Sequence, residues 1–308
     1  MATANLRALA RYSDSLSQVY LEHAVIERES NSIAAFTPEG RITLPAANLS
    51  SVILGPGTRI THAAIKVLAD CGALVAWTGG EGLSFYACGQ SKTRLSNGVE
   101  IQARHWADPE LHLRVVRRMY QFRFADDLSP RLTLEQIRGK EGVRVRETYQ
   151  RLAREYGVTW NGRRYDRSSW EQADPINRAL SAANAALYAI VLAGLHSLGY
   201  SPSLGFIHTG KQLSFAYDVS DLVKTCTSFP AAFEAAASGG DKVESRARRI
   251  LRDRCCHERL QDRITKCVPA LFATQAIDEE LAISDQVSSL WDPTGLVQGG
   301  VQHGRHDS

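Results

Sequence analysis

The hydrophobic pattern of the chain changes its period near residue 92. Before that point the apolar runs are short, of strand length, and separated by turn signals. After it, apolar residues recur at helical spacing, as at Leu111, Val115 and Met119. The pattern therefore predicts an α+β fold, with a small β-rich N-terminal domain over residues 1–92 and a larger all-helical C-terminal domain over residues 93–285.

Within these two parts the sequence predicts individual elements. Strands are expected at 19–25, 51–54, 73–78 and 83–88, with one helix at 62–70. The helical part is expected to break at 158–165, where Asn161-Gly162 between β-formers is typical of a two-residue hairpin turn. The last stretch, 286–308, is polar and rich in glycine, and we expect a flexible C-terminal tail.

The composition sets modest bounds on location and partners. A chain of 308 residues with 44% hydrophobic residues and a net charge of +3 can bury a sizeable core, and its charge argues neither for nor against a polyanionic partner. Its longest apolar run extends only from 185 to 195, whereas a membrane helix needs about 20 residues. The six cysteines show no CxxC spacing. We expect reduced thiols, no membrane span and a cytoplasmic protein.

One run of twenty residues combines an imidazole with two carboxylates. In GFIHTGKQLSFAYDVSDLVK, His208 precedes Asp218 and Asp221, and the two acids are spaced to share one face of a helix. Carboxylates with an occasional imidazole are typical ligands of Mg²⁺ or Mn²⁺. The alternative is structural, with Asp218 capping a helix and Asp221 in its first turn.

Glu141 is an acid on the apolar side of a predicted helix, in line with Val145 and Tyr149. An acid buried there needs a metal, a base or a proton. The alternative is a wet position at a helix N-terminus. Gly139 and Gly142 on either side would let the backbone approach another group closely, or would simply break the helix.

The basic and aromatic residues are compatible with binding to a nucleic acid. Arginine is concentrated at 138–167 and 246–259, as in phosphate-binding surfaces or in solvated helix faces. Four tyrosines and tryptophans near these segments could stack on unpaired bases or belong to the core. The GxxxxGK match at 205–211 is excluded as a nucleotide loop, because Gln212 follows it and QLSFAY is strand-like.

Five motifs together carry a specific resemblance: LGPGTRITHAAI, KEGVRVRETY, YGVTWNGRRYD, ADPINRALSAANAALY and GFIHTGKQLSFAYDVSDLVK. From about residue 12 to residue 270 the chain resembles CRISPR-associated protein one, the spacer-acquisition integrase, in its type I-E branch. The resemblance implies a metal-dependent DNA endonuclease and integrase that joins the 3′-hydroxyl ends of a short protospacer duplex to the CRISPR repeat.

The resemblance also implies which residues act. Glu141, His208 and Asp221 would hold Mg²⁺ or Mn²⁺, and Asp218 would complete the catalytic set. Contacts to DNA would come from Tyr165, Trp170, Tyr188, Lys211, Tyr217, Lys224 and Arg248. The implied partners are double-stranded DNA with single-stranded 3′ ends, CRISPR repeat DNA, a second copy through the N-terminal domain, and the second, smaller CRISPR-associated protein in a heterohexamer.

Two other classes of function stay open on the sequence. A stand-alone metal-dependent endonuclease acting on branched DNA would use the same acids with water as the nucleophile. A non-catalytic DNA-binding scaffold would keep the arginine clusters and would not depend on Glu141, His208 or Asp221.

Overall fold

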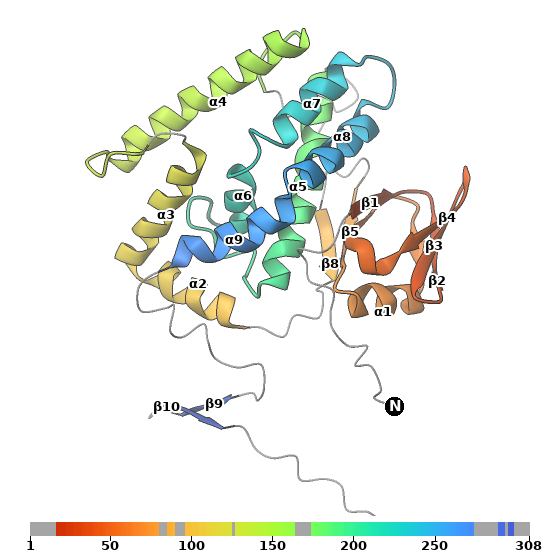
Figure 1. Cartoon of the computed structure of the whole chain (residues 1–308), viewed down its shortest axis with the longest axis horizontal. Coiled ribbons are helices and arrows are strands. Elements are labelled where there is room, and N and C mark those ends of the chain that lie inside the picture. The colour runs from red at the N-terminus through yellow and green to blue at the C-terminus, as the bar shows by residue number, and fades with distance from the viewer. Residues whose placement is uncertain are drawn as a thin grey trace, which may run out of the picture. The chain divides into compact units, whose positions relative to one another are not determined.

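The computed structural model describes residues 17–79, 85–89, 96–124, 127–163, 174–273, 289–292 and 295–298. The chain divides into two compact units, and the boundary between them follows Phe272. The larger unit contains a β-rich part followed by a helical part (Figure 1). This order confirms the predicted α+β class.

Two four-stranded sheets form the β-rich part (Figure 1). In the first, β1 (Ser17–Leu21), β5 (Leu49–Leu54) and β7 (Leu74–Thr78) run parallel, and β8 (Phe85–Gly89) closes the edge antiparallel to β7. In the second, β4 (Gly40–Pro45), β3 (Ser32–Thr37) and β2 (Val25–Glu29) pair antiparallel, and the short β6 (Arg59–Ile60) runs parallel to β2.

The burial of these strands follows from their place in the sheets. Every residue of β5 is buried, as expected for a central parallel strand covered on both faces. A short 3-10 turn, Ala46–Asn48, leads into it. Helix α1 (His62–Asp70) begins where the Thr61 side chain accepts a hydrogen bond from the Ala64 amide, and Leu68 of this helix packs into the core that both sheets share.

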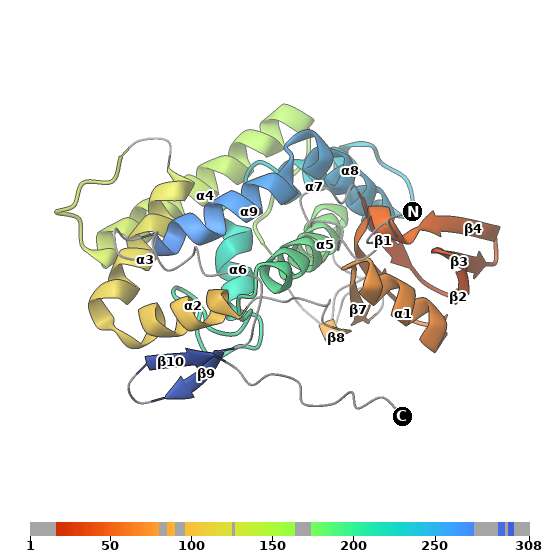
Figure 2. The ribbon, with the colours of Figure 1, turned by 60° about the horizontal axis from the view of Figure 1, so that its bottom comes forward.

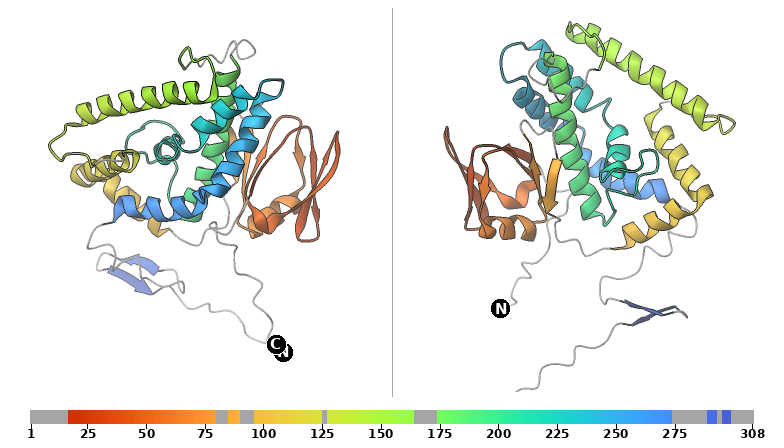
Figure 3. Two further views of the ribbon diagram at one scale, coloured as in Figure 1. Left: turned by 45° about the horizontal axis from the view of Figure 1, so that its top comes forward. Right: turned by 180° about the vertical axis from the view of Figure 1, so that it is seen from behind.

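Eight helices of the described residues make the helical part. Their bounds are α2 (Asn97–Ala107), α3 (Pro109–Arg123), α4 (Leu134–Tyr156), α5 (Pro175–Ser197), α6 (Ser214–Asp221), α7 (Ser228–Ala237), α8 (Val243–His257) and α9 (Leu260–Phe272). Helix α5 lies in the middle and contacts α6, α7, α8 and α9, while α4 crosses one side of the group (Figures 1 and 2). Figure 3 shows the short α6 between α4 and α9.

Helix α5 is the core element of the helical part. By length and composition it would suffice to cross a membrane, but 83% of its apolar 18-residue window is buried inside the protein. Leu180 of α5 and Phe233 of α7 belong to one cluster of buried apolar residues. Helix α5 also contacts β5 and β7 of the first sheet. The apolar character of α5 is therefore explained by packing within the protein.

Several predicted elements have the wrong form. The strand expected at 19–25 is two strands, because the backbone turns at His23, whose φ is 50°. No strand forms over 158–163, the described part of the predicted hairpin. Instead, the side-chain amide of Asn177 in α5 donates to the backbone carbonyl oxygen of Gly162 at 3.2 Å, and the Trp160 ring stacks on Tyr149 of α4.

The second unit contains a small hairpin within the stretch expected to be a flexible tail. Strands β9 (Ser289–Asp292) and β10 (Gly295–Gln298) pair antiparallel, with Trp291 opposite Leu296. In the larger unit, no disulfide joins the six cysteines, all of which lie among the described residues.

Candidate active site

Helix α4 carries Glu141 well inside its length. The helix begins with a capping box formed by Thr133 and Gln136, so Glu141 lies about two turns beyond its start. Its side chain is 15% exposed. The alternative of a wet acid at a helix N-terminus is therefore wrong, and Glu141 is a largely buried carboxylate.

Asp218 is a fully buried carboxylate on α6, and it organises the loop before that helix. Its Oδ2 accepts hydrogen bonds from the backbone amides of Phe206 at 2.7 Å and Ile207 at 3.0 Å. Its Oδ1 accepts from the amide of His208 at 2.9 Å and lies 2.7 Å from the imidazole Nδ1. Asp218 thus does not cap its own helix. It binds loop 206–208 and the His208 ring.

The loop that Asp218 binds is tightly folded. A Cβ at Gly205 would lie 2.2 Å from the carbonyl oxygen of His208 and 2.6 Å from the Cβ of Ser214. Only glycine fits such an approach. The segment QLSFAY, which looked strand-like, contains the start of α6. A helix does therefore follow GxxxxGK, but Gln212 still stands in place of the Ser or Thr of a nucleotide loop.

Two carboxylates from different helices meet at one arginine. The guanidinium of Arg123, at the end of α3, places Nη1 3.4 Å from Oε1 of Glu141 and Nη2 3.7 Å from Oδ2 of Asp221. Arg144 donates to Glu141 through Nε at 2.7 Å and Nη2 at 2.9 Å. Lys224 Nζ lies 2.6 Å from Oδ1 of Asp221. Each acid therefore has a cation of its own and shares Arg123 with the other.

The charges around Asp221 and Lys224 keep both groups ionised. Burial favours the neutral acid of Asp221, but Lys224 and Arg123 outweigh it and hold its pKa below the usual range. Burial likewise acts to lower the pKa of Lys224, but Tyr188 and Asp221 outweigh it and raise that pKa. Burial raises the pKa of the neighbouring Tyr149 phenol to about 12.

His208 is oriented by Asp218. The short contact through Nδ1 is that of an N–H donating to a carboxylate, and it leaves Nε2 as the nitrogen that can accept or bind a ligand. The same hydrogen bond raises the pKa of His208 above its ordinary value, against a smaller opposing effect of burial. An imidazole held by a carboxylate in this way is the usual arrangement of a histidine metal ligand.

The donor set suits a hard divalent ion in its chemistry. Carboxylates of Glu141 and Asp221 already converge on one cation, and the imidazole oriented by Asp218 interacts electrostatically with Asp221. Within the described residues, however, no three His, Cys, Asp or Glu side chains lie close enough together to hold an ion. The cation between the two carboxylates is the guanidinium of Arg123 instead. The residues therefore fit a divalent ion by the type of their donor atoms.

Of the seven residues predicted to contact DNA, the structure describes five. The rings of Tyr188 and Tyr217 meet edge to face at 4.9 Å, and Lys224 lies 4.9 Å from the Tyr188 centroid, so these three adjoin the acids. Lys211 lies in the exposed loop before α6. Arg248 lies apart on α8, with its guanidinium 4.0 Å from the Tyr20 ring of β1. Tyr165 and Trp170 lie outside the described residues.

Sequence reasoning did not predict that Arg123, Arg144 and Lys224 would hold the acids, and it expected Lys224 to contact DNA. Arg144 had a detectable signal, because it follows Glu141 by one helical turn. Arg123 had none, since its two partners lie on other helices. Its side chain is only 4% exposed, which excludes it as a surface contact and makes it part of the site's interior.

The two glycines beside Glu141 do not mark a close backbone approach. A Cβ at Gly139 or Gly142 would meet no atom within 4 Å. Replacing Gly139 by alanine is therefore expected to stabilise the protein by about 0.5–1 kcal/mol in chemical denaturation, because glycine is a poor residue inside a helix. Gly157→Ala is the matched control. It has equal space, but its φ of 65° predicts a loss of about 1–2 kcal/mol. A loss at both positions would contradict this account.

The raised pKa of His208 predicts a pH dependence of folding stability. Its protonated form is favoured in the folded state, so its contribution is fully present below the ordinary pKa of about 6.5 and is lost as pH rises through the higher folded value. The difference in unfolding free energy between the metal-free wild type and His208→Gln should shrink from pH 5.5 to about pH 8.5. A difference that grows with pH would be incompatible with the Asp218 contact.

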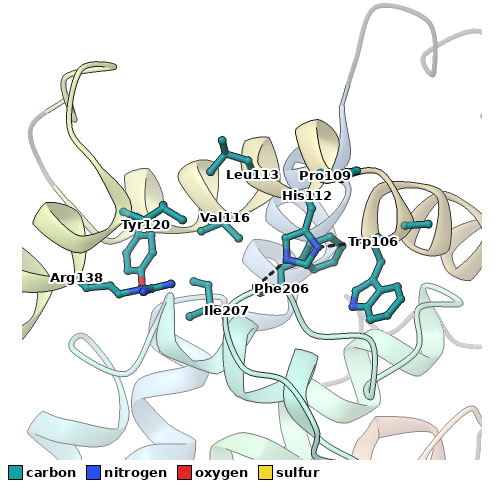
Figure 4. A pocket seen from close by; sticks show the side chains of 11 residues that line it. Trp106, Pro109, His112, Leu113, Val116, Tyr120, Arg138, Phe206 and Ile207 are labelled. Atoms are coloured by element: carbon teal, nitrogen blue, oxygen red, sulfur yellow. Dashed lines mark hydrogen bonds between the residues drawn. The ribbon is translucent and has the colours of Figure 1, made fainter.

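A separate pocket lies on the other side of loop 206–208. Its volume is about 410 Å³. Phe206 and Ile207 point their side chains toward it while their amides bind Asp218, and the ring nitrogens of His112 lie 3.0 Å from the carbonyl oxygen of Phe206 and 3.2 Å from that of Trp106 (Figure 4). The lining is mainly apolar and includes no acid. Phe206 and Ile207 of the loop line this pocket, and the pocket contributes no acid to the site.

Comparisons with known proteins place the chain in a family. The family model described as CRISPR associated protein Cas1 matches residues 122–239, the stretch that carries Arg123, Glu141, His208 and Asp221. CRISPR-associated endonuclease Cas1 2 of Thermus thermophilus is 49% identical over 311 residues, covering 98% of this chain and 94% of that protein. CRISPR-associated endonuclease Cas1 of Escherichia coli strain K12 is 41% identical over 241 residues, covering 78% of this chain and 79% of that one.

A solved structure shows the same fold in a complex. The crystal structure of a TtCas1–DNA complex superposes with a TM-score of 0.81 at 49% identity, covering 92% of this chain and all of that one. The similarity in sequence and in structure extends over both parts of the larger unit. The chain therefore belongs to the Cas1 family of CRISPR-associated endonucleases.

Proposed function

We propose that this Cas1 protein is the metal-dependent DNA integrase of CRISPR adaptation, joining the 3′-hydroxyl ends of a short protospacer duplex to the CRISPR repeat by transesterification. One observation carries the proposal. Two largely buried carboxylates from separate helices, Glu141 and Asp221, converge on a single cation, and the His208 imidazole that Asp218 orients interacts electrostatically with Asp221. Such a cluster suits phosphoryl transfer, where growing negative charge has to be neutralised.

In this proposal Glu141, His208 and Asp221 hold Mg²⁺ or Mn²⁺. When bound, the ion lowers the pKa of the attacking hydroxyl and neutralises charge on the scissile phosphate. Asp218 is a positioning residue, because it holds the His208 ring by Nδ1 and leaves Nε2 for the ligand. Lys224 and Arg144 orient Asp221 and Glu141 through their short contacts.

The DNA is proposed to approach beside α6. Tyr188 and Tyr217 lie next to Asp221 and Lys224, where aromatic rings can stack on the bases of a splayed end. Lys211 in the exposed loop would bind phosphate. Tyr165 and Trp170 complete the proposed DNA contacts, with Arg248 further away on α8. The DNA in the structure of the 49% identical relative supports DNA as the ligand of this chain.

The sequence motifs further support the type I-E branch of the family. There the β-rich domain, residues 1–92, would join two copies of the chain, residues 93–285 would form the catalytic domain, and residues 286–308 would form a C-terminal tail. We propose a heterohexamer with the second, smaller CRISPR-associated protein, in the cytoplasm. Its substrates would be double-stranded DNA with single-stranded 3′ ends and the CRISPR repeat.

A stand-alone endonuclease acting on branched DNA is the second candidate, because the same acids could direct water to the phosphate. The relatives' names specify an endonuclease activity. A non-catalytic scaffold fits the structure less well, since it would not need two buried acids and an oriented imidazole in one place.

Strand transfer distinguishes these candidates. A labelled forked duplex with 3′-hydroxyl ends is incubated with a supercoiled plasmid carrying a CRISPR repeat, with and without Mg²⁺ or Mn²⁺ and the smaller partner. The proposal predicts a joined product that requires metal and increases with the partner. Cleavage of branched DNA without joining would contradict the integrase proposal and favour the stand-alone endonuclease. DNA binding without any reaction would favour the non-catalytic scaffold.

A further inference from the structure

We propose that Arg123 is an internal counter-cation of the active site, which takes the place of the divalent ion between Glu141 and Asp221 in the metal-free protein and thereby sets the affinity for metal. The inference rests on the proposed metal site. It concerns a residue that is not itself a ligand, and it predicts that removing Arg123 strengthens metal binding.

Arg123 lies between the two acids. Its guanidinium is the only group among the described residues that contacts both acids, with Nη1 3.4 Å from Glu141 Oε1 and Nη2 3.7 Å from Asp221 Oδ2. The two acids come from α4 and α6, whereas Arg123 ends α3. A single cation of a third helix therefore does what a bound ion would do, which is to hold two carboxylates of different elements together.

The N–H groups of Arg123 are incompletely paired. Its side chain is 4% exposed, yet its Nε and Nη2 make no hydrogen bond among the described residues. The guanidinium also lies over the Tyr120 ring, whose centroid is 5.1 Å from the guanidinium carbon. A buried guanidinium normally donates most of its N–H groups. Incomplete pairing makes Arg123 the cation of this site that is easiest to displace.

The neighbouring cations Arg144 and Lys224 bind the acids more closely than Arg123 does. Arg144 binds Glu141 through two nitrogens at 2.7 and 2.9 Å, and Lys224 lies 2.6 Å from Asp221. These contacts are short, and each serves one acid. With Arg123 included, three fixed positive charges face two carboxylates. A divalent ion entering this group is repelled by the excess charge, and the repulsion is strong where water is largely excluded.

The expected size of the effect follows from known charge interactions. A fixed charge within a few ångströms changes the affinity of a carboxylate for a proton by about tenfold to a thousandfold. A divalent ion carries twice the charge of a proton, so removal of Arg123 should strengthen its binding by at least about tenfold. If Arg123 served instead to preorganise the two acids, its removal would weaken binding.

The test is the dissociation constant of Mn²⁺, measured by electron paramagnetic resonance of the free ion with the full chain and no DNA. Arg123→Met keeps the apolar stem and removes the charge. It is expected to bind Mn²⁺ at least about tenfold more tightly than the wild type. Arg123→Lys keeps a charge that cannot span both acids, and an intermediate affinity is expected. This variant also serves if Arg123→Met does not fold.

Arg117→Met is the matched control. Arg117 lies on the same helix as Arg123 and donates to the carbonyl oxygen of Leu132 at 2.7 Å. Its substitution therefore removes an equal charge at a position away from the two acids. Its Mn²⁺ affinity should equal that of the wild type. Unchanged or weaker binding in both Arg123 variants would overturn the inference, as would absence of Mn²⁺ binding in the wild type and in both variants.

A further variant separates this inference from the proposed function. Asp221→Asn should weaken Mn²⁺ binding if the metal site is correct. If it does and the Arg123 variants bind no more tightly, only the role of Arg123 is wrong. If Mn²⁺ binds equally well to the wild type and to Asp221→Asn, the ion lies elsewhere and the proposed site fails together with the inference.

Discussion

Asp221→Asn is expected to reduce DNA joining by at least about 100-fold while the protein still binds DNA. Loss of even an outer-shell partner of a metal ligand typically costs 10–100-fold in metal affinity or activity, and Asp221 is proposed as a ligand itself. The asparagine oxygen can still accept from Lys224, which lies 2.6 Å from Oδ1, so the local structure should persist. The measurement is the initial rate of joined product in Mg²⁺, beside a DNA-binding titration.

Asp262→Asn is a suitable control for this experiment. Its side chain is 22% exposed, against 21% for Asp221, and it too is paired with an arginine, Arg259. It lies at the start of α9, away from the acids. The control should retain the wild-type joining rate. Equal joining by Asp221→Asn and the wild type would contradict the assignment of Asp221, even if overall activity were confirmed.

Asp218→Asn is expected to have the largest effect on stability. The fully buried Asp218 carboxylate accepts from three backbone amides and from His208. An asparagine has one acceptor oxygen, and its amide group would face a donor. Since hydrogen bonds to charged groups contribute about 1.5–3 kcal/mol each, a loss on the order of 3 kcal/mol is expected in urea unfolding.

The matched change for Asp218 is Asp253→Asn on α8, where the acid side chain is 62% exposed and paired with Arg252. It should alter stability by less than about 0.5 kcal/mol. The Asp218 variant should also join DNA poorly, because loop 206–208 and the His208 ring lose their common anchor. Wild-type stability for Asp218→Asn would show that the carboxylate does not organise this loop.

Much of the fold could be predicted from periodicity. The helix expected at 62–70 has these bounds in α1, and the change to helical spacing after residue 92 matches the order of sheets and helices. Strand β4 was missed because five of its six residues are exposed, so it shows no alternation. QLSFAY was misread because a short alternating run fits either a strand or the start of a buried helix.

The acids of the site could be predicted from the sequence, but the contacts that its cations make with them could not. Glu141 was noticed because an acid on an apolar helical stripe is unusual, and His208 and Asp218 because of their spacing in one run. Their contact is made by a loop whose tight turn depends on Gly205, which no periodicity reveals. Arg123 lies 18 residues from Glu141 in sequence and on a different helix. Only the packing of α3 against α4 and α6 brings these groups together.

The central claim is that Glu141, His208 and Asp221 bind one divalent ion. Anomalous diffraction from crystals grown with Mn²⁺ tests it most directly, because manganese is located independently of any assay. The account predicts one anomalous peak per subunit, within about 2.0–2.4 Å of an oxygen of each acid and of His208 Nε2, with the guanidinium of Arg123 moved away. A peak bound by other residues, while Arg123 still bridges Glu141 and Asp221, would contradict it.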